Sequence, residues 1–384
     1  MSLAVDIGAL TVKVASDQEV TTIPAPSGGP RRGIRAALAA QSQRGGFCVA
    51  VPDAWLAGDV AGAGRQEDVR YECEDVAGTG PVVWTGQLAA VAALTAGQHG
   101  RGRYLVCDLG GSGVRAGMFD VSDGTVQIVS THTADGGGWA DFDAAIRSAV
   151  TGTGLPVTWY EQAAGQELRA SMVLEDAAMS PGEFADTRVY RISGPGGNID
   201  LTASQVTGCF APTLQRLRAA IGAVTGAGLP ESVVLTGGLS WLPLGVRVVA
   251  DAVGITPQRS GPDAPARGAL LFACGEFRLA PPVERQAVTL TAHRIHDGLL
   301  EEVSVILPWT APFATVPGGA LAIDRDELEL TVDGRSHTVR LSGLGPGPHR
   351  IGVRPNWGSP GVLVVRPITG DSACLFPLAD LTAR

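Results

Sequence analysis

Two aspartate–glycine turns carry the side chains of this chain that could bind a phosphate group or a metal ion. The first lies in the run AVDIGALTVK, which contains Asp6 and Gly8 and ends at Lys13, the sole lysine of the 384 residues. Glycine lets backbone N–H groups approach an anion, because it has no Cβ and tolerates positive φ. A preceding aspartate can hold magnesium, and a lysine beyond the turn adds a point charge for a phosphate. The run therefore predicts a phosphate-binding turn.

Two further glycine turns strengthen this hypothesis. LVCDLGGSGV repeats the Asp-x-Gly spacing with Asp108 and Gly110, and VVLTGGLS contains Gly237 and Gly238. One Gly-rich turn at a strand end is weak evidence in an α/β protein, whereas two with matching spacing and a third Gly-Gly turn are stronger. Lys13 keeps two interpretations at this point: a solvent-exposed lysine at a strand end, or a contact to a phosphate.

The flanking sequence predicts the strands and helices that position these turns. Over the first 278 residues, Val-rich strand patterns alternate with Ala-rich helical ones, which is typical of an α/β domain. Strand–turn–strand patterns surround Asp6 and Asp108, and a strand–turn–helix pattern surrounds Gly237. Helices are predicted over TGQLAAVAALTAG, ADFDAAIRSAV and ASQVTGCFAPTLQRLRAAIGAVTGAG.

Beyond residue 278 the pattern changes to alternating polar and apolar residues, as in VTLTAHRI, EVSVILPW and ELELTV. Asp333-Gly334 stands between two such runs and predicts a tight hairpin. We therefore expect a nucleotide-binding domain over residues 1–278, a Pro-containing linker over 279–286, and a small all-β, sandwich-like domain of six or seven strands over 287–384.

Composition excludes several classes of partner. The formal net charge is −9 and the arginines are scattered, which argues against nucleic acid and against an anionic membrane surface. No apolar run reaches the roughly 18 residues of a membrane span, and the first residues lack the pattern of a signal peptide. The six cysteines form no C-x-x-C pair and favour a reducing compartment. We therefore expect a cytoplasmic protein, and the preference for Arg over Lys suggests a GC-rich bacterial genome.

The order of these motifs resembles the nucleotide-binding domain of DnaK-type heat-shock chaperones, in the actin, sugar-kinase and heat-shock ATPase superfamily. The resemblance covers about residues 3–275 and rests on VDIGALTVKVA, LVCDLGGSGVRAGMFDV, GGGWADFDAAI, VVLTGGLSWLPLGVRVVADAVG and GPDAPARGALLFA. It implies an actin-like ATPase fold of two lobes (ribonuclease H-like), with ATP or ADP and Mg²⁺ bound between the lobes.

The resemblance also implies roles for individual residues. Asp6 and Asp108 would hold the metal ion. Adenosine would contact Gly237, Gly238 and Trp241, although core packing explains a tryptophan equally well. Phosphate binding is implied for a set of eight residues: Gly8, Ala9, Leu10, Lys13, Gly110, Gly111, Ser112 and Gly113. A basic residue in the place of Lys13 is the pattern of actins and many sugar kinases rather than of DnaK-type chaperones.

Several departures from the family predict slow or absent hydrolysis, and no catalytic residue is assigned. Ala9 and Leu10 replace two threonines, so hydroxyl donors are lost. Gly86-Gln87 replaces a Glu-Pro pair that helps to position metal and water, and no lysine stands in the place of the family's catalytic lysine. Asp176 stands where the family has a lysine in the helix that contacts adenosine.

These observations predict a DnaK-like ATP-binding protein, at most a weak ATPase, whose C-terminal β domain binds a protein or peptide partner under nucleotide control. One alternative is a pseudo-ATPase that serves as a protein-interaction scaffold with a degenerate cleft. The other is an actin-like filament protein. A sugar kinase is disfavoured, because no aspartate besides the two candidate metal ligands is identified as a base.

Overall fold

The computed structural model describes residues 2–384 with the following exceptions: 9–10, 17–18, 25–45, 56–59, 78–81, 98–99, 152–188, 195–196, 241, 281–286, 308–320, 324–326, 342–346, 357–358, 368–372, 379 and 381–384. Its contacts divide the chain into two units. The first unit comprises Met1–Val5, Ala25–Thr85 and Pro281–Arg384, and the second comprises Asp6–Pro24 and Gly86–Ala280. Each unit is described by itself.

A six-stranded sheet forms the centre of the second unit, in the order β12-β11-β6-β7-β8-β13 among the described residues. β6, β7 and β8 form an antiparallel meander, and β11 lies parallel to β6 on its other side. The strands are β6 (Gly102–Leu109), β7 (Gly113–Ser122), β8 (Thr125–Asp135), β11 (Ser232–Thr236), β12 (Gln258–Arg259) and β13 (Arg278–Leu279).

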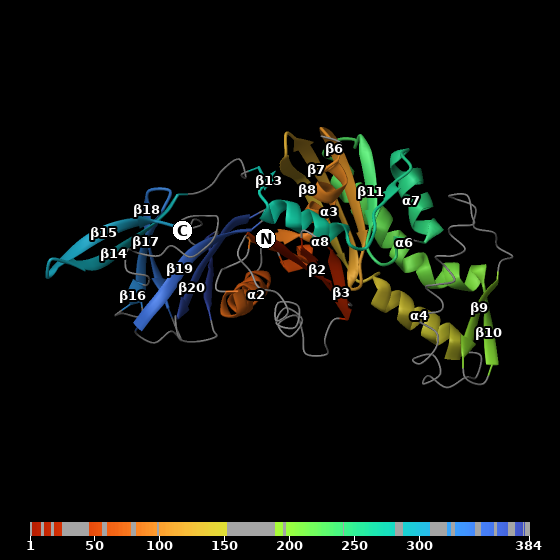
Figure 1. Ribbon diagram of the computed structural model, residues 1–384, viewed down its shortest axis with the longest axis horizontal. Coiled ribbons are helices and arrows are strands. Elements are labelled where there is room, and N and C mark those ends of the chain that lie inside the picture. The colour runs from red at the N-terminus through yellow and green to blue at the C-terminus, as the bar shows by residue number, and fades with distance from the viewer. Residues whose placement is uncertain are drawn as a thin grey trace. The chain divides into compact units, whose positions relative to one another are not determined.

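Helices cover both faces of this sheet, with α6 and α7 on one side and α3 and α8 on the other (Figure 1). The core on the α6 side takes alternate residues of β6, Leu105, Cys107 and Leu109, and packs them against Phe142 and Phe210. Because side chains alternate along a strand, Val106 and Asp108 face the opposite side. The helices are α3 (Gly86–Thr95), α4 (Trp139–Thr151), α6 (Ala203–Thr225), α7 (Pro243–Val253) and α8 (Ala264–Ala273).

Local sequence explains where these elements begin and end. Thr202 caps α6 through a reciprocal capping box with Gln205, directly after a hairpin of β9 (Val189–Gly194) and β10 (Gly197–Thr202). Pro243 begins α7, and Gly254 ends it in the left-handed conformation. The helices predicted over TGQLAAVAALTAG, ADFDAAIRSAV and ASQVTGCFAPTLQRLRAAIGAVTGAG are confirmed as α3, α4 and α6, with α3 and α6 each ending before the predicted glycine.

The N-terminal strand β1 (Leu3–Ile7) is central in a sheet of order β3-β2-β1-β4-β5. Its residues Asp6 and Ile7 belong to the second unit, together with the antiparallel pair β2 (Thr11–Ser16) and β3 (Val20–Pro24). In the first unit, β4 (Phe47–Val51) and β5 (Val82–Thr85) run parallel to each other. The short helix η1 (Asp53–Trp55) and α2 (Val60–Ala77) come between β4 and β5 in the chain.

The C-terminal part of the first unit contains two antiparallel four-stranded sheets, of orders β15-β14-β17-β18 and β16-β19-β20-β21. Inward-facing residues of both sheets, such as Leu290, Leu330, Val353 and Leu363, form one core. The strands are β14 (Val288–His296), β15 (Leu299–Ile306), β16 (Leu321–Ile323), β17 (Glu327–Val332), β18 (Arg335–Arg340), β19 (Gly347–Asn356), β20 (Ser359–Pro367) and β21 (Cys374–Pro377). The described residues thus form eight strands, where six or seven were expected.

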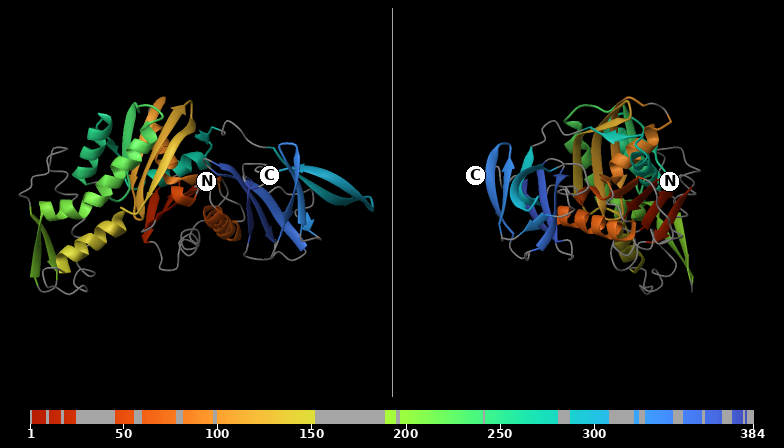
Figure 2. Two further views of the ribbon diagram at one scale, coloured as in Figure 1. Left: turned by 180° about the vertical axis from the view of Figure 1, so that it is seen from behind. Right: turned by 60° about the vertical axis from the view of Figure 1, so that its left-hand side comes forward.

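Turn chemistry explains the hairpins of this part. The predicted Asp333-Gly334 hairpin between β17 and β18 is confirmed, and both residues have positive φ. A second Asp-Gly turn joins β14 to β15, and this hairpin extends beyond the rest of its sheet, because β17 pairs only with residues 288–290 of β14 (Figure 2).

Elsewhere in the unit, the Arg366 guanidinium lies 5.1 Å from the ring centre of Tyr71 on α2.

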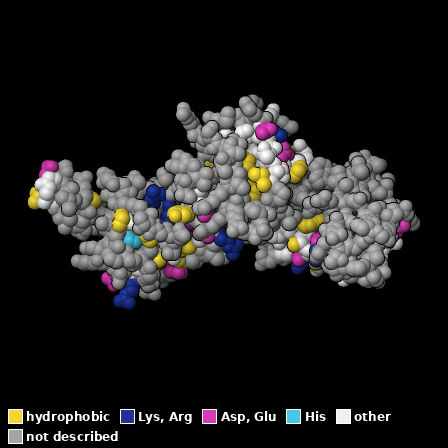
Figure 3. Space-filling view, turned by 60° about the horizontal axis from the view of Figure 1, so that its bottom comes forward, with side chains coloured by type: hydrophobic (Ala, Val, Ile, Leu, Met, Phe, Trp, Pro, Cys, Tyr) yellow, Lys and Arg dark blue, Asp and Glu magenta, His cyan; other side chains and the backbone are white. Residues whose placement is uncertain are grey.

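The predicted α/β class is confirmed, since the chain mixes helices with parallel and antiparallel sheets. No helix of the described residues is long and apolar enough to cross a membrane. Among the described residues, Leu229, Leu299 and Ile306 are exposed large hydrophobic side chains. On the face shown in Figure 3, the hydrophobic side chains that are coloured lie in small separate groups among charged ones.

Candidate functional site

The first Asp-x-Gly turn joins β1 to β2 and is closed by an ion pair. The Gly8 N–H donates to the Thr11 carbonyl at 3.0 Å, which folds the chain back into β2. The Lys13 ammonium then donates to Asp6 Oδ2 at 3.1 Å. The Lys13 and Asp6 side chains are only 13% and 10% exposed, so the lysine is not a solvated residue at a strand end. That interpretation is wrong, because the turn brings the ammonium back over the aspartate.

The second Asp-x-Gly turn, between β6 and β7, repeats this arrangement. The Gly110 N–H donates to the Gly113 carbonyl at 3.1 Å. Arg115, seven residues after Asp108 as Lys13 is after Asp6, donates from Nη1 to Asp108 Oδ2 at 3.0 Å. Its Nη2 donates to the Ser112 hydroxyl at 3.2 Å. The two turns therefore share one plan: an aspartate, a glycine two residues later, and a cation at the seventh position.

The two aspartates lie close enough to influence each other. Burial raises the pKa of Asp6 above its usual value, Lys13 opposes this shift, and the charge of Asp108 adds to it. Asp108 raises the pKa of the neighbouring Cys107 thiol as well, although burial is the larger cause there. Both turns thus belong to the second unit and lie near enough for the charge of Asp108 to act on Asp6.

A row of polar side chains crosses the sheet at this region. Thr236 at the end of β11 is the register partner of Asp108, and Asp108 is the partner of Arg115 on β7. Register partners in neighbouring strands point to the same face, here the face opposite the Leu105 core. Thr236 is 2% exposed, and its hydroxyl has no hydrogen-bond partner among the described residues.

The third glycine turn packs directly on the second. Gly237 has φ +93°, and a Cβ at this position would lie 2.4 Å from Asp108 Oδ1 and 2.4 Å from the Leu109 carbonyl oxygen. Only glycine fits there, because both the backbone conformation and the contact exclude a side chain. The Leu239 N–H donates to the Leu109 carbonyl at 3.1 Å and holds the two turns together.

The first residues of α4 also bind the second turn. The N–H groups of Trp139 and Ala140 donate to the Gly110 and Gly111 carbonyls, each at 3.0 Å. The carbonyls of the turn therefore satisfy N–H groups that a helix start leaves open. Asp141, in the first turn of α4, accepts a hydrogen bond from the Gly137 N–H. The turn is consequently fixed from two sides, by α4 and by the Gly237 turn.

Gln87 stands near the start of α3, where the resemblance would have a Glu-Pro pair. Its amide is 1% exposed and donates to the Val106 carbonyl at 3.4 Å. Its Oε1 has no partner among the described residues, and it lies 2.8 Å from where a Cβ on Gly117 would be. A carboxamide cannot accept a proton as a general base, so this position supplies no base for hydrolysis.

The structure brings together most of the residues predicted for the site. Asp6, Gly8 and Lys13 lie at the first turn, and Asp108 with Gly110, Gly111, Ser112 and Gly113 lies at the second. Gly237 contacts Asp108, and Gly238 follows it in the same turn. Ala9, Leu10 and Trp241 lie outside the described residues, as do Asp176 and linker residues 281–286.

Sequence reasoning missed two members of the site, Arg115 and Thr236. Arg115 was detectable, because its spacing from Asp108 equals that of Lys13 from Asp6. Thr236 carried no such signal, since a threonine is common at the end of a strand made of β-branched residues. Its position beside Asp108 follows only from the pairing of β11 with β6.

A magnesium ion suits these residues poorly. Mg²⁺ is usually held by one or two carboxylates together with water and substrate phosphates, so two aspartates are the right type of ligand. Each of them, however, already has a cation at hydrogen-bond distance. In the described ranges, no group of three or more His, Cys, Asp or Glu side chains is placed so that it could hold a metal ion. Metal binding by Asp6 and Asp108 stays a prediction from the resemblance.

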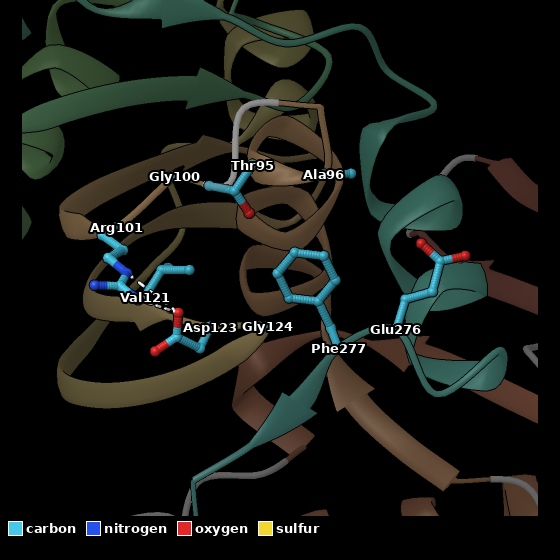
Figure 4. Close-up of a pocket in the computed structure, with 9 residues that line it drawn as sticks. All are labelled: Thr95, Ala96, Gly100, Arg101, Val121, Asp123, Gly124, Glu276 and Phe277. Atoms are coloured by element: carbon cyan, nitrogen blue, oxygen red, sulfur yellow. Dashed lines mark hydrogen bonds and ion pairs between the residues drawn. The ribbon is translucent and has the colours of Figure 1, made fainter.

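The second unit has a separate cavity at the opposite end of β6 and β7. Its volume is about 630 Å³, and Phe277 and the Arg101–Asp123 ion pair are among its lining groups (Figure 4). Arg101 and Asp123 are about 70% exposed, and the lining is otherwise made of small or aliphatic side chains with Glu276. This cavity holds none of the residues of the three turns.

Comparison with known proteins adds no assignment. No model of a known protein family matches the chain, and no curated protein is significantly similar to it in sequence.

Proposed function

We propose that the second unit binds ATP or a related nucleoside polyphosphate at the Asp6 and Asp108 turns, as the resemblance to actin-type ATPases implies. One observation carries this proposal: two glycine turns far apart in sequence share the same plan of aspartate, glycine and paired cation, and the charge of the second aspartate acts on the first. Lysine and arginine are the residues that bind phosphate, as a point charge and as a planar fork respectively. In this proposal the fold is the two-lobed, actin-like one.

Slow or absent hydrolysis is part of the proposal. The position near the start of α3 holds an amide, Gln87, in place of a carboxylate. The sole lysine is paired with Asp6 and belongs to the first turn, so no lysine serves as a second catalytic cation. What the site offers is charge and positioning, the means by which phosphoryl-transfer proteins hold their nucleotide. We therefore propose nucleotide-dependent, chaperone-like or regulatory protein binding, with the C-terminal β part contacting the partner.

A pseudo-ATPase scaffold is the second candidate, and one observation favours it. Asp6 and Asp108 are each neutralised within the protein, so the turns keep a balanced set of charges without any ligand. An actin-like filament protein is the third candidate, and the spacing of Lys13 is the observation in its favour. Sedimentation of the protein with and without nucleotide distinguishes the filament from the other two.

Calorimetric titration with ATP in the presence of magnesium tests the proposal. We expect micromolar or tighter binding by the natural chain. Lys13→Ala should weaken it at least tenfold, a loss of about 1.4 kcal/mol. Arg101→Ala is the matched control, because it removes a cation from an exposed ion pair at the other end of the sheet and should leave affinity unchanged.

Two results would change the conclusion. Absence of binding at millimolar ATP would leave the scaffold as the function. Equal affinity in the natural chain and in a folded Lys13→Ala variant would remove Lys13 from the site and leave its ion pair with Asp6 a structural role only.

A further inference from the structure

The charges at the two turns cancel within the protein. Lys13 lies 3.1 Å from Asp6, and Arg115 lies 3.0 Å from Asp108, with the four side chains between 9% and 20% exposed. A divalent ion entering here would bring two positive charges to carboxylates that are already compensated. It would have to displace an ammonium and a guanidinium into surroundings with little water, where an uncompensated charge is costly.

The same region presents hydrogen-bond donors that fit an anion. The Thr236 hydroxyl is buried on the face of Asp108 and Arg115 and has no partner within the described part of the chain. Among the described residues the Lys13 ammonium donates to Asp6, and an ammonium carries three donor protons in all. The backbone N–H groups of Gly111 and Ser112, at the tip of the second turn, donate to no other backbone group in the described residues.

From this arrangement we propose that the site binds the phosphate groups of its nucleotide without a divalent metal ion, with Lys13 and Arg115 in the metal's electrostatic role. The proposal rests on the nucleotide-binding function above and specifies its chemistry. Each cation bridges its aspartate and a phosphate oxygen, as a metal ion between a carboxylate and a phosphate would. Arg115, whose Nη1 and Nη2 already donate to Asp108 and Ser112, supplies a delocalised positive charge beside the phosphate, and Lys13 supplies a point charge.

The symmetry of the turns explains why two cations are needed. A magnesium ion contributes two positive charges, and the two turns contribute one each from the same position in the plan. A chain with a single lysine nevertheless has a cation at both of these positions. Retention of one charge alone would leave one aspartate uncompensated beside the phosphates.

Calorimetry on the natural chain tests the proposal directly, with ATP titrated once in magnesium and once in EDTA. The expected result is a Kd in EDTA within about threefold of that in magnesium. Binding in magnesium with a loss of more than about tenfold in EDTA would overturn metal independence and leave nucleotide binding intact. Failure to bind in either buffer would instead reject the proposed function itself.

Two substitutions at one position sharpen the test. Arg115→Gln leaves Asp108 without its cation, so ATP affinity in EDTA should fall at least about tenfold, and magnesium should restore part of it. Arg115→Lys keeps the charge and should retain binding in EDTA. Arg101→Gln, in an exposed pair outside the site, should change neither titration.

The folded state of each variant is checked by its circular dichroism and thermal unfolding. If Arg115→Gln does not fold, the EDTA titration of the natural chain still decides. A folded Arg115→Gln variant that binds ATP in EDTA as tightly as the natural chain would contradict the role given to Arg115. Titration with Mn²⁺ alone, followed by electron paramagnetic resonance, should show no tight site, and a tight site would contradict the proposal.

Discussion

Replacement of Lys13 by methionine should reveal how strongly the first turn depends on its ion pair. The substitution keeps the length of the side chain and removes its charge, which leaves Asp6 buried without its cation. Removing one partner of a buried pair costs about 3–5 kcal/mol. Because the Lys13 and Asp6 side chains keep 13% and 10% exposure, the lower end of this range applies, about 3 kcal/mol at neutral pH.

The loss should depend on pH, with a sign that follows from Asp6. Burial raises the folded-state pKa of this carboxyl above its ordinary value of 3.8, so the folded chain holds the proton more tightly than the unfolded chain does. Such a group contributes its full stabilisation of the folded state at pH values below its unfolded-state pKa of 3.8. This contribution is lost as the pH rises through the folded-state pKa. Lys13 lowers the folded-state pKa of Asp6. Without Lys13 this pKa is higher, so the pH range over which ionisation of Asp6 destabilises the folded state extends to higher pH.

The gap in stability between the natural chain and Lys13→Met should therefore widen from acid to neutral pH. Between about pH 4.5 and about pH 7.5 we expect it to grow from about 1 to about 3 kcal/mol, below the limit of about 1.4 kcal/mol per pH unit for one group. Urea unfolding followed by far-ultraviolet circular dichroism at both pH values measures it.

Arg101→Met is the matched control for this experiment. It breaks an ion pair with Asp123 that is about 70% exposed, so it should change stability by less than about 0.5 kcal/mol at either pH. A Lys13→Met variant that loses less than about 1 kcal/mol at neutral pH would refute the view that Asp6 depends on its lysine. An equal loss at both pH values would refute the link to Asp6 ionisation.

Two further predictions concern packing and thiol reactivity. Gly268→Ala should destabilise the protein by at least about 2 kcal/mol in urea unfolding, because the new Cβ would lie 1.4 Å from the Ala89 carbonyl oxygen where α8 crosses α3. Gly222→Ala on α6 should instead stabilise by about 0.5–1 kcal/mol, because no described residue outside the helix's own backbone lies within 4 Å of the added Cβ. Equal effects of the two substitutions would contradict the close crossing. Alkylation of the native protein should modify the exposed Cys274 first, while Cys48 and Cys107 stay protected because burial raises the pKa of both thiols. Peptide mapping identifies the modified cysteines, and early modification of Cys107 would contradict its place in the core.

Elements with a strong local signal were predictable from the sequence. The Asp333-Gly334 hairpin follows from two residues that accept positive φ, and α6 follows from its length and its Thr202 cap. Helix α2 was missed, because its apolar residues are few and form no stripe along one side. Its burial depends on neighbours far away in the chain, such as Arg366 over Tyr71, and no local pattern reports them.

The sequence by itself determined the two turns. An aspartate, a glycine and a cation at fixed spacing are enough to fold the chain back. The turn then closes an ion pair between residues seven apart in sequence, and every group involved is local. Tertiary structure decided what these turns do together. The register of β11 against β6 sets Thr236 beside Asp108, and burial turns two short ion pairs into a compensated, water-poor site. Such a site depends on the charges and the solvent around each group, and these arise only when distant strands meet.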